Sequence, residues 1–173
     1  MSSIHPCSLP ADALLGAYAG NGAYTDCYAT DIPIAVSHAQ YVSAFYTTRV
    51  FKFERLILKW AVSKPSTDAQ AELLATGAID SFAAWNVERR AEDQLLMCDF
   101  QGRTRSWLMV APAGAATGIG SRLYFGSAVV PRKHPKTGRS TLGGGFEALL
   151  GFHKTYSRVL LHAARSQLAA ARP

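Results

Sequence analysis

Four strand-like segments follow one another between residues 81 and 130, and the links between them are short. The links read "AED", "QGR" and the glycine-rich "AGAATGIGS". Parallel strands need a crossover connection of about a dozen residues or more, usually a helix, and these links leave no room for one. The sequence therefore predicts an antiparallel meander and disfavours a doubly wound parallel sheet. The predicted strands are Ser81 to Arg90, Gln94 to Phe100, Thr104 to Pro112 and Arg122 to Val130.

Two capping-box patterns predict helices before the meander. Ser37 is followed three residues on by Gln40, and a helical region is expected over 38–62, as two consecutive helices or one kinked helix. Thr67 is followed three residues on by a glutamine, and a short helix is expected over 68–76. Helical spacing predicts the buried face of the second half of the first region, formed by Phe53, Leu56, Ile57 and Trp60.

The remaining elements lie near the two ends of the chain. A short helix is expected within Pro10 to Gly20 and a strand over Tyr24 to Ile32, with residues 1–20 peripheral to the domain. A long helix is expected from Phe146 to about Ala170. Its apolar residues cover most of its circumference and its charges form a narrow stripe, so it should lie largely buried across a sheet.

Composition bounds the remaining possibilities. The chain has 173 residues, which suits a single domain over 1–173 with a flexible basic and glycine-rich loop at 131–144. Apolar residues make up 49% and charged residues 17%, which favours a large buried fraction, a cavity lining or an oligomer interface. The net charge of +6 has its densest group at Pro131 to Arg139, either a solvated loop or an anion-binding patch. That group lacks aromatic residues, and nucleic acid is not an expected partner.

Cysteine, histidine and hydropathy patterns exclude further classes. The three cysteines have no metal-ligand spacing and cannot all pair, which favours a reducing compartment. The five histidines also lack zinc-ligand spacing, so neither a metal nor another cofactor is expected. The chain has no apolar run of about 18 residues and no basic segment before an apolar N-terminal stretch, so neither a membrane span nor a signal peptide is expected. The cytoplasm is the expected location.

The order of strand, helices, antiparallel strands and a long apolar C-terminal helix resembles the helix-grip fold of the START/Bet v 1-like (SRPBCC) superfamily. The segments "SWLMVAP", "RLYFGSAVV" and "LGFHKTYSRVLL" also look like those of bacterial members. The resemblance covers about residues 22–170 and implies an α+β fold in which a curved antiparallel sheet packs on the last helix, with a cavity between them. The predicted strands are fewer than the usual seven, and the helix at 68–76 is an addition. Because the superfamily contains binders and enzymes, fold alone does not give function.

The segment "LLMCDFQGRTRSW" at Leu95 to Trp107 predicts a hairpin with charges at its turn. If Gln101 and Gly102 form the turn, Cys98 lies opposite Arg105 and the two sheet faces separate. One face carries Asp99 with Leu95, Met97, Thr104, Ser106, Leu108 and Val110. The other carries the arginines with Leu96, Cys98, Phe100, Trp107 and Met109. The face that meets the last helix decides whether Asp99 or Arg105 is the polar residue of interest.

These patterns predict binding of a small apolar or amphipathic molecule between the sheet and the C-terminal helix. The candidate ligand-binding residues are Trp85, Met97, Asp99, Arg105, Trp107, Met109, Tyr124, Phe146, Leu150, His153 and Tyr156. One alternative is an enzyme acting in the same cavity through His153, Tyr156, Asp99 or Arg105. The other is a non-catalytic homodimer formed through the second apolar sheet face.

Overall fold

The fold was determined as a computed structural model that describes residues 3–62, 65–114, 120–133, 140–141 and 146–171. Within these ranges, the side chains of 57–62, 132–133, 140–141, 146–150 and 152 lie outside the described part. Seven strands form one antiparallel sheet that is not closed, in the order β1-β2-β7-β6-β5-β4-β3. The strands are β1 His5–Pro6, β2 Tyr24–Ile32, β3 Ser81–Phe82, β4 Trp85–Arg90, β5 Gln94–Asp99, β6 Thr104–Pro112 and β7 Ser121–Val129. A separate pair is formed by β8 Arg132–Lys133 and β9 Ser140–Thr141.

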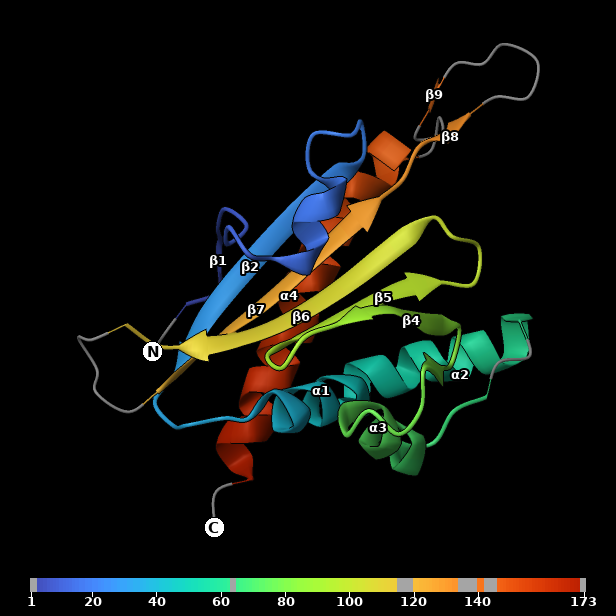
Figure 1. The fold of residues 1–173 in the computed structure, drawn as a ribbon. Coiled ribbons are helices and arrows are strands. Elements are labelled where there is room, and N and C mark those ends of the chain that lie inside the picture. The colour runs from blue at the N-terminus through green and yellow to red at the C-terminus, as the bar shows by residue number, and fades with distance from the viewer. Residues whose placement is uncertain (1–2, 63–64, 115–119, 134–139, 142–145, 172–173) are drawn as a thin grey trace.

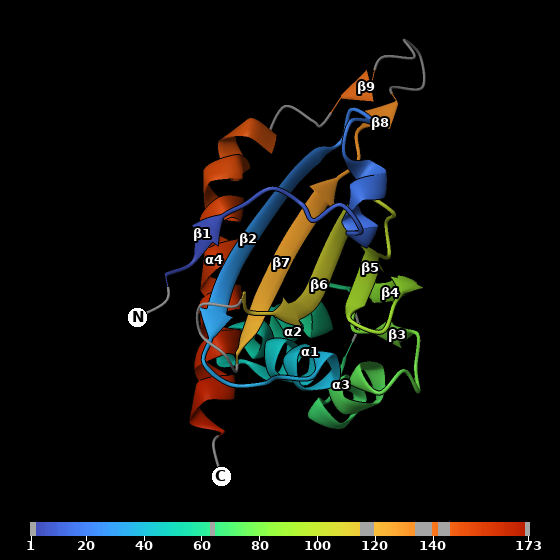
Figure 2. The ribbon, with the colours of Figure 1, turned by 60° about the vertical axis from the view of Figure 1, so that its left-hand side comes forward.

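Helices lie on one side of the sheet and the N-terminal segment lies on the other (Figures 1 and 2). The α-helices are α1 His38–Thr47, α2 Arg49–Val62, α3 Asp68–Ala75 and α4 Phe146–Ala170, and η1 Leu14–Tyr18 is a 3-10 helix. The predicted α+β class, the antiparallel meander and the bounds of the C-terminal helix are confirmed. The first predicted strand of the meander is divided into β3 and β4, because Ala83 between them has a positive φ of 52°.

Both predicted capping boxes are present and fix where the helices begin. Ser37 accepts a hydrogen bond from the backbone of Gln40, whose side chain returns one to the backbone of Ser37, and Thr67 and Gln70 do the same for α3. Region 38–62 is two helices because Thr48 is extended, with φ −57° and ψ 152°. The Thr48 hydroxyl then accepts a hydrogen bond from the backbone of Phe51 at 3.1 Å and helps to start α2.

The predicted buried face of α2 is wrong in its first half. Phe53 is 66% exposed and Leu56 is 50% exposed, whereas Phe51 and Arg55 are buried. Phe51 packs edge-on against Tyr46, with ring centroids 4.8 Å apart, and this contact fixes the rotation of the helix. The same rotation turns Glu54 inward. The Ile57 and Trp60 side chains lie outside the described residues.

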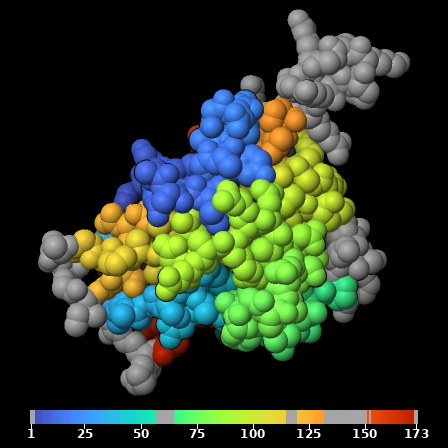
Figure 3. All heavy atoms as spheres, in the orientation of Figure 1, coloured from blue at the N-terminus to red at the C-terminus, as the bar shows by residue number. Residues whose placement is uncertain are grey.

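Alternation along the strands sorts the core into two layers. The side facing α1 and α4 carries a large apolar cluster that includes Tyr28, Leu95, Leu108 and Phe125. The opposite side carries a smaller cluster that includes Leu96 and Trp107, and the N-terminal segment covers it with Leu15 (Figure 3). Residues 1–20 were expected to be peripheral, but Leu15 is fully buried.

The C-terminal helix is buried along one stripe and not around most of its circumference. Ser157, Leu160, Leu161 and Ala164 are buried at helical spacing, whereas Val159 is 43% exposed. The stripe faces β2, β7 and α1. This differs from the expected largely buried helix, because the sheet covers one side of α4 only.

Candidate functional site

The helix-facing side of the sheet changes from apolar to polar along its strands. One row of residues paired across neighbouring strands packs entirely within the apolar core. It consists of Tyr28, Phe125, Leu108 and Leu95. Two residues further along the strands, towards the β5–β6 turn, the corresponding row consists of Asp26, Ser127, Ser106, Met97 and Val87. Three of these five are polar, and a polar row inside a core is costly unless its groups are hydrogen-bonded.

Helical side chains complete this region, which we call the polar cluster. It consists of Asp26, Ser106 and Ser127 from the sheet, Tyr46 from α1, Glu54 from α2, and His153 and Tyr156 from α4. His153 and Tyr156 lie three residues apart on one face of the helix, as neighbours on a helical surface do. Trp85 reaches the same region from β4.

Glu54 is the centre of the cluster on the helical side. Its carboxylate accepts a hydrogen bond from the Tyr156 hydroxyl, and the Trp85 indole lies near enough to act on it. Burial raises the pKa of Glu54 above its usual range, while these two groups act in the opposite direction. Burial next to this carboxylate also raises the pKa of Tyr156. A partly buried acid therefore lies between two of the residues that the sequence predicted as ligand contacts.

Tyr46 carries a hydroxyl without a hydrogen bond. The side chain is 1% exposed, and its oxygen has no hydrogen-bond partner of acceptable geometry. Burial raises the pKa of Tyr46, Ser106 lies near enough to lower it, the charge of Glu54 raises it further, and the charge of Arg90 lowers it. The hydroxyl makes no hydrogen bond, and Ser106 and Glu54 are among its polar neighbours. An unpaired buried hydroxyl costs about 1–3 kcal/mol.

Asp26, Ser127 and His153 form the sheet-side half of the cluster. Ser127 Oγ lies 2.6 Å from Asp26 Oδ1 and 2.7 Å from His153 Nε2. Asp26 Oδ2 lies 3.6 Å from the same histidine nitrogen. With the Ser127 hydroxyl donating to Asp26, the histidine Nε2–H donates to Ser127. In a nucleophilic triad the acid orients the other ring nitrogen, so this arrangement is a hydrogen-bonded tie between sheet and helix and not an acylation site.

Asp99 lies on the helix-facing side but serves its own turn. Asp99 Oδ1 accepts hydrogen bonds from the backbone of Arg103 at 2.7 Å and of Thr104 at 3.1 Å. The predicted pairing of Cys98 with Arg105 is confirmed, and with it the separation of the two faces. The face that meets α4 is therefore that of Asp99, whose carboxylate is occupied by the hairpin.

Four predicted ligand-binding residues lie on the opposite face. They are Arg105, Trp107, Met109 and Tyr124, and the last three belong to the cluster that the N-terminal segment covers. They cannot line a space between the sheet and α4. The prediction that these four residues contact a ligand in that space is therefore wrong. Strand alternation had already divided the hairpin in this way, but the predicted set combined both faces.

Arg105 and Gln94, two polar residues of that opposite face, are paired within the chain. Arg105 Nε lies 2.9 Å from both Tyr18 Oη and Glu88 Oε2, and its guanidinium stacks on the Tyr18 ring at 4.7 Å. Gln94 Oε1 accepts hydrogen bonds at 2.9 Å from the Trp107 indole and from the backbone of Leu14. The proposed homodimer surface, the second apolar sheet face, is likewise covered by residues of the same chain.

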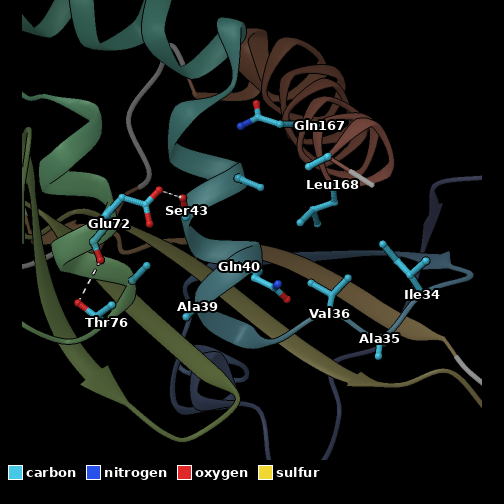
Figure 4. A pocket seen from close by; sticks show the side chains of 13 residues that line it. Ile34, Ala35, Val36, Ala39, Gln40, Ser43, Glu72, Thr76, Gln167 and Leu168 are labelled. Atoms are coloured by element: carbon cyan, nitrogen blue, oxygen red, sulfur yellow. Dashed lines mark hydrogen bonds between the residues drawn. The ribbon is translucent and has the colours of Figure 1, made fainter. Parts of the chain in front are cut away.

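Hollows in the described surface lie elsewhere. One of about 550 Å³ lies between α1, α3 and the end of α4 (Figure 4), and two more flank the segment before α1. None of the predicted ligand residues lines them. In the groove of Figure 4 the polar side chains satisfy one another, since Ser43 donates to Glu72 and Gln167 Nε2 donates to Thr47 Oγ1 at 2.7 Å. Phe146 and Leu150 were also predicted as contacts, and their side chains lie outside the described residues.

Comparison of the chain with protein-family models, with curated proteins and with solved structures found no match. Among the described residues, no helix is long and apolar enough to cross a membrane. The same residues contain no group of three acidic, histidine or cysteine side chains placed to hold a metal ion.

Sequence reasoning missed the acid at the centre of the site. Glu54 was given no role, because the predicted buried face rested on Phe53 and Leu56. A competing face at i, i+1 and i+4, formed by Val50, Phe51 and Glu54, was the available signal. Tyr46 lies on the buried face of its helix, but its unpaired hydroxyl has no sequence signal.

Proposed function

We propose that the protein binds a small amphipathic molecule between the sheet and helices α2 and α4, with the polar part of the molecule at the polar cluster. The unpaired, fully buried Tyr46 hydroxyl beside the partly buried Glu54 carboxylate carries this proposal. A core built only for stability would pair or omit such groups, since each costs free energy. A ligand that bonds to Tyr46 would repay this cost.

The orientation of α2 supports the same function. Its described half turns an acid inward and leaves Phe53 and Leu56 exposed, the reverse of a helix that only covers a core. The helix-grip resemblance supports it further, because its sheet and last helix enclose a ligand space in that superfamily. We extend the expectation of the helix-grip fold to this chain as part of the proposal.

Co-purified ligand gives the first test. Native mass spectrometry of the protein from its own cells should show a bound small molecule in addition to the 18.6 kDa chain. The same spectrum reports whether the protein is a monomer or a dimer. Absence of a bound molecule after gentle extraction, together with no saturable binding of decan-1-ol, would contradict the proposal.

Two tryptophans on opposite faces locate the site. Trp85 contacts Glu54 and Trp107 lies on the covered face. In a Trp60→Phe background, which removes the third tryptophan, decan-1-ol should change the emission of the protein and of its Trp107→Phe variant, and the change should be lost in its Trp85→Phe variant. The opposite pattern would place the ligand on the N-terminal side and refute the proposed location.

A further inference from the structure

We propose that the molecule held at the polar cluster carries a hydrogen-bond-donating head group, a hydroxyl or a protonated amine, on an apolar body, and that the site rejects carboxylates and phosphates. The inference rests on the proposed function and specifies its ligand class. Three observations support it: the charges of the cluster, the hydrogen-bond positions that its groups leave unused, and the apolar row beside them.

The charges of the cluster are negative. Asp26 and Glu54 both contribute carboxyl groups, and a ligand anion at the Tyr46 hydroxyl would lie close to Glu54 in surroundings of low dielectric constant, where repulsion between like charges is strong. His153 is the one group of the cluster that can become cationic, and it already lies 3.6 Å from Asp26.

The described arginines nearest to the cluster are engaged elsewhere. Arg55 pairs with Asp68 at 2.7 Å, and Arg90 donates to the backbone oxygens of Leu74 and Ile79. Arg158 is exposed and lies over the Tyr28 ring, 5.4 Å from its centroid. Arg90 is the described cation whose charge acts on Tyr46, and its effect is smaller than the opposite effect of Glu54.

The hydrogen-bonding valences fit a donor that can also accept. A carboxylate offers about four lone-pair positions, and Glu54 uses one of them for Tyr156, with the Trp85 indole close by. Those remaining can accept from a hydroxyl or an ammonium group. The Tyr46 hydroxyl can at the same time donate to a ligand hydroxyl, which would give this buried group the partner that it lacks within the chain.

The residues next to the cluster indicate that the rest of the ligand is apolar. Met97 belongs to the polar row and is fully buried, and Leu95 and Leu108 form the apolar row beside it. Beyond the cluster, the packing of this layer is mainly aliphatic and aromatic, and Thr30 is a buried polar residue within it. A head group at Glu54 thus leads into apolar surroundings, as an amphipathic ligand requires.

A matched series of ten-carbon probes tests the ligand class. Decan-1-ol, decylamine and decanoate share one chain length and differ in the head group only, and each is titrated against bound N-phenyl-1-naphthylamine at pH 7. We expect decanoate to bind at least tenfold more weakly than the alcohol or the amine. The net charge of +6 would by itself favour the anion, so the expected order runs against bulk attraction.

Variants assign the discrimination to the cluster. Glu54→Gln should weaken decylamine binding at least fivefold and reduce the disadvantage of decanoate, whereas Glu92→Gln, a matched change at an exposed glutamate, should alter neither. Tyr46→Phe provides a second variant if the first does not fold, and it should weaken decan-1-ol binding.

The outcomes separate the two proposals. Decanoate binding as tightly as the alcohol would overturn the ligand class and leave the proposed function standing. Failure of all three probes and of N-phenyl-1-naphthylamine to bind would overturn the proposed function itself.

Discussion

The two faces of the β5–β6 hairpin carry similar numbers of polar groups but treat them differently. On the face covered by the N-terminal segment, Gln94 and Arg105 use their donors and acceptors within the chain. On the helix-facing side, Tyr46 is left unpaired next to a partly buried carboxylate. Polar groups that complete one another stabilise a fold, and polar groups left incomplete indicate a place where another molecule completes them.

Gln94 should be the residue whose loss most damages the paired face. It is 4% exposed and bonds to the Trp107 indole and to the backbone of Leu14 and Asp12. Gln94→Leu should lower the free energy of unfolding by roughly 3–5 kcal/mol, because two buried N–H donors lose their acceptor. Urea denaturation measures this loss. Gln101→Leu, at an exposed turn position, is the control, and equal stability of both variants would show that the paired network contributes little.

A disulfide between Cys7 and Cys27 should stabilise the same face by about 3 kcal/mol, since it closes a loop of this size in the unfolded chain. The two sulfurs lie 3.2 Å apart across residues 20 positions apart, and Cys7 is the more exposed. Oxidised glutathione would take two electrons and two protons from the two thiols and leave two molecules of reduced glutathione. Thiol labelling should then find Cys98 alone, and the urea midpoint should rise.

Cys7→Ser is the control for this experiment, because its stability should not respond to oxidised glutathione. Labelling of all three cysteines after exposure to the oxidant would show that the thiols do not pair. The pair went unnoticed in the sequence because residues 1–10 contained no strand pattern, and β1 has only two residues.

The sequence predicts the features of the fold that a few adjacent residues determine. It does not predict the features that tertiary contacts determine. Period-two alternation placed Leu95 and Leu96 on opposite faces, and capping boxes placed the starts of α1 and α3, because these are properties of a few adjacent residues. The inward turn of Glu54 is set by Phe51, which packs on residues far away in the chain. Trp85 and Tyr156 both lie next to Glu54, and no single segment of the sequence predicts this arrangement.

The pH dependence of stability should distinguish the partly buried carboxylate from a surface one. The pKa of Glu54 is raised in the folded protein from 4.5, so its stabilising contribution is complete below that pH and is lost as the pH rises through the folded-state pKa. Glu54→Gln should therefore have a higher Tm than the parent at pH 8, with the difference shrinking towards pH 4. Glu92→Gln should follow the parent at every pH. Parallel curves for Glu54→Gln and the parent would mean that the carboxylate is not held in a buried site.

The smallest expected effect gives the sharpest comparison, because it contrasts two buried tyrosines on one helix. Tyr41 and Tyr46 are 0% and 1% exposed, but Tyr41 Oη donates to the backbone oxygen of Tyr124 at 3.0 Å whereas Tyr46 Oη has no partner. Tyr41→Phe should lower the free energy of unfolding by about 1 kcal/mol, and Tyr46→Phe should raise it by about the same amount, since an unpaired polar group is removed. Ligand-free protein is required, because a bound alcohol would supply the missing partner. If both variants lose stability equally, the Tyr46 hydroxyl is satisfied inside the chain, and the reason for placing a ligand there disappears.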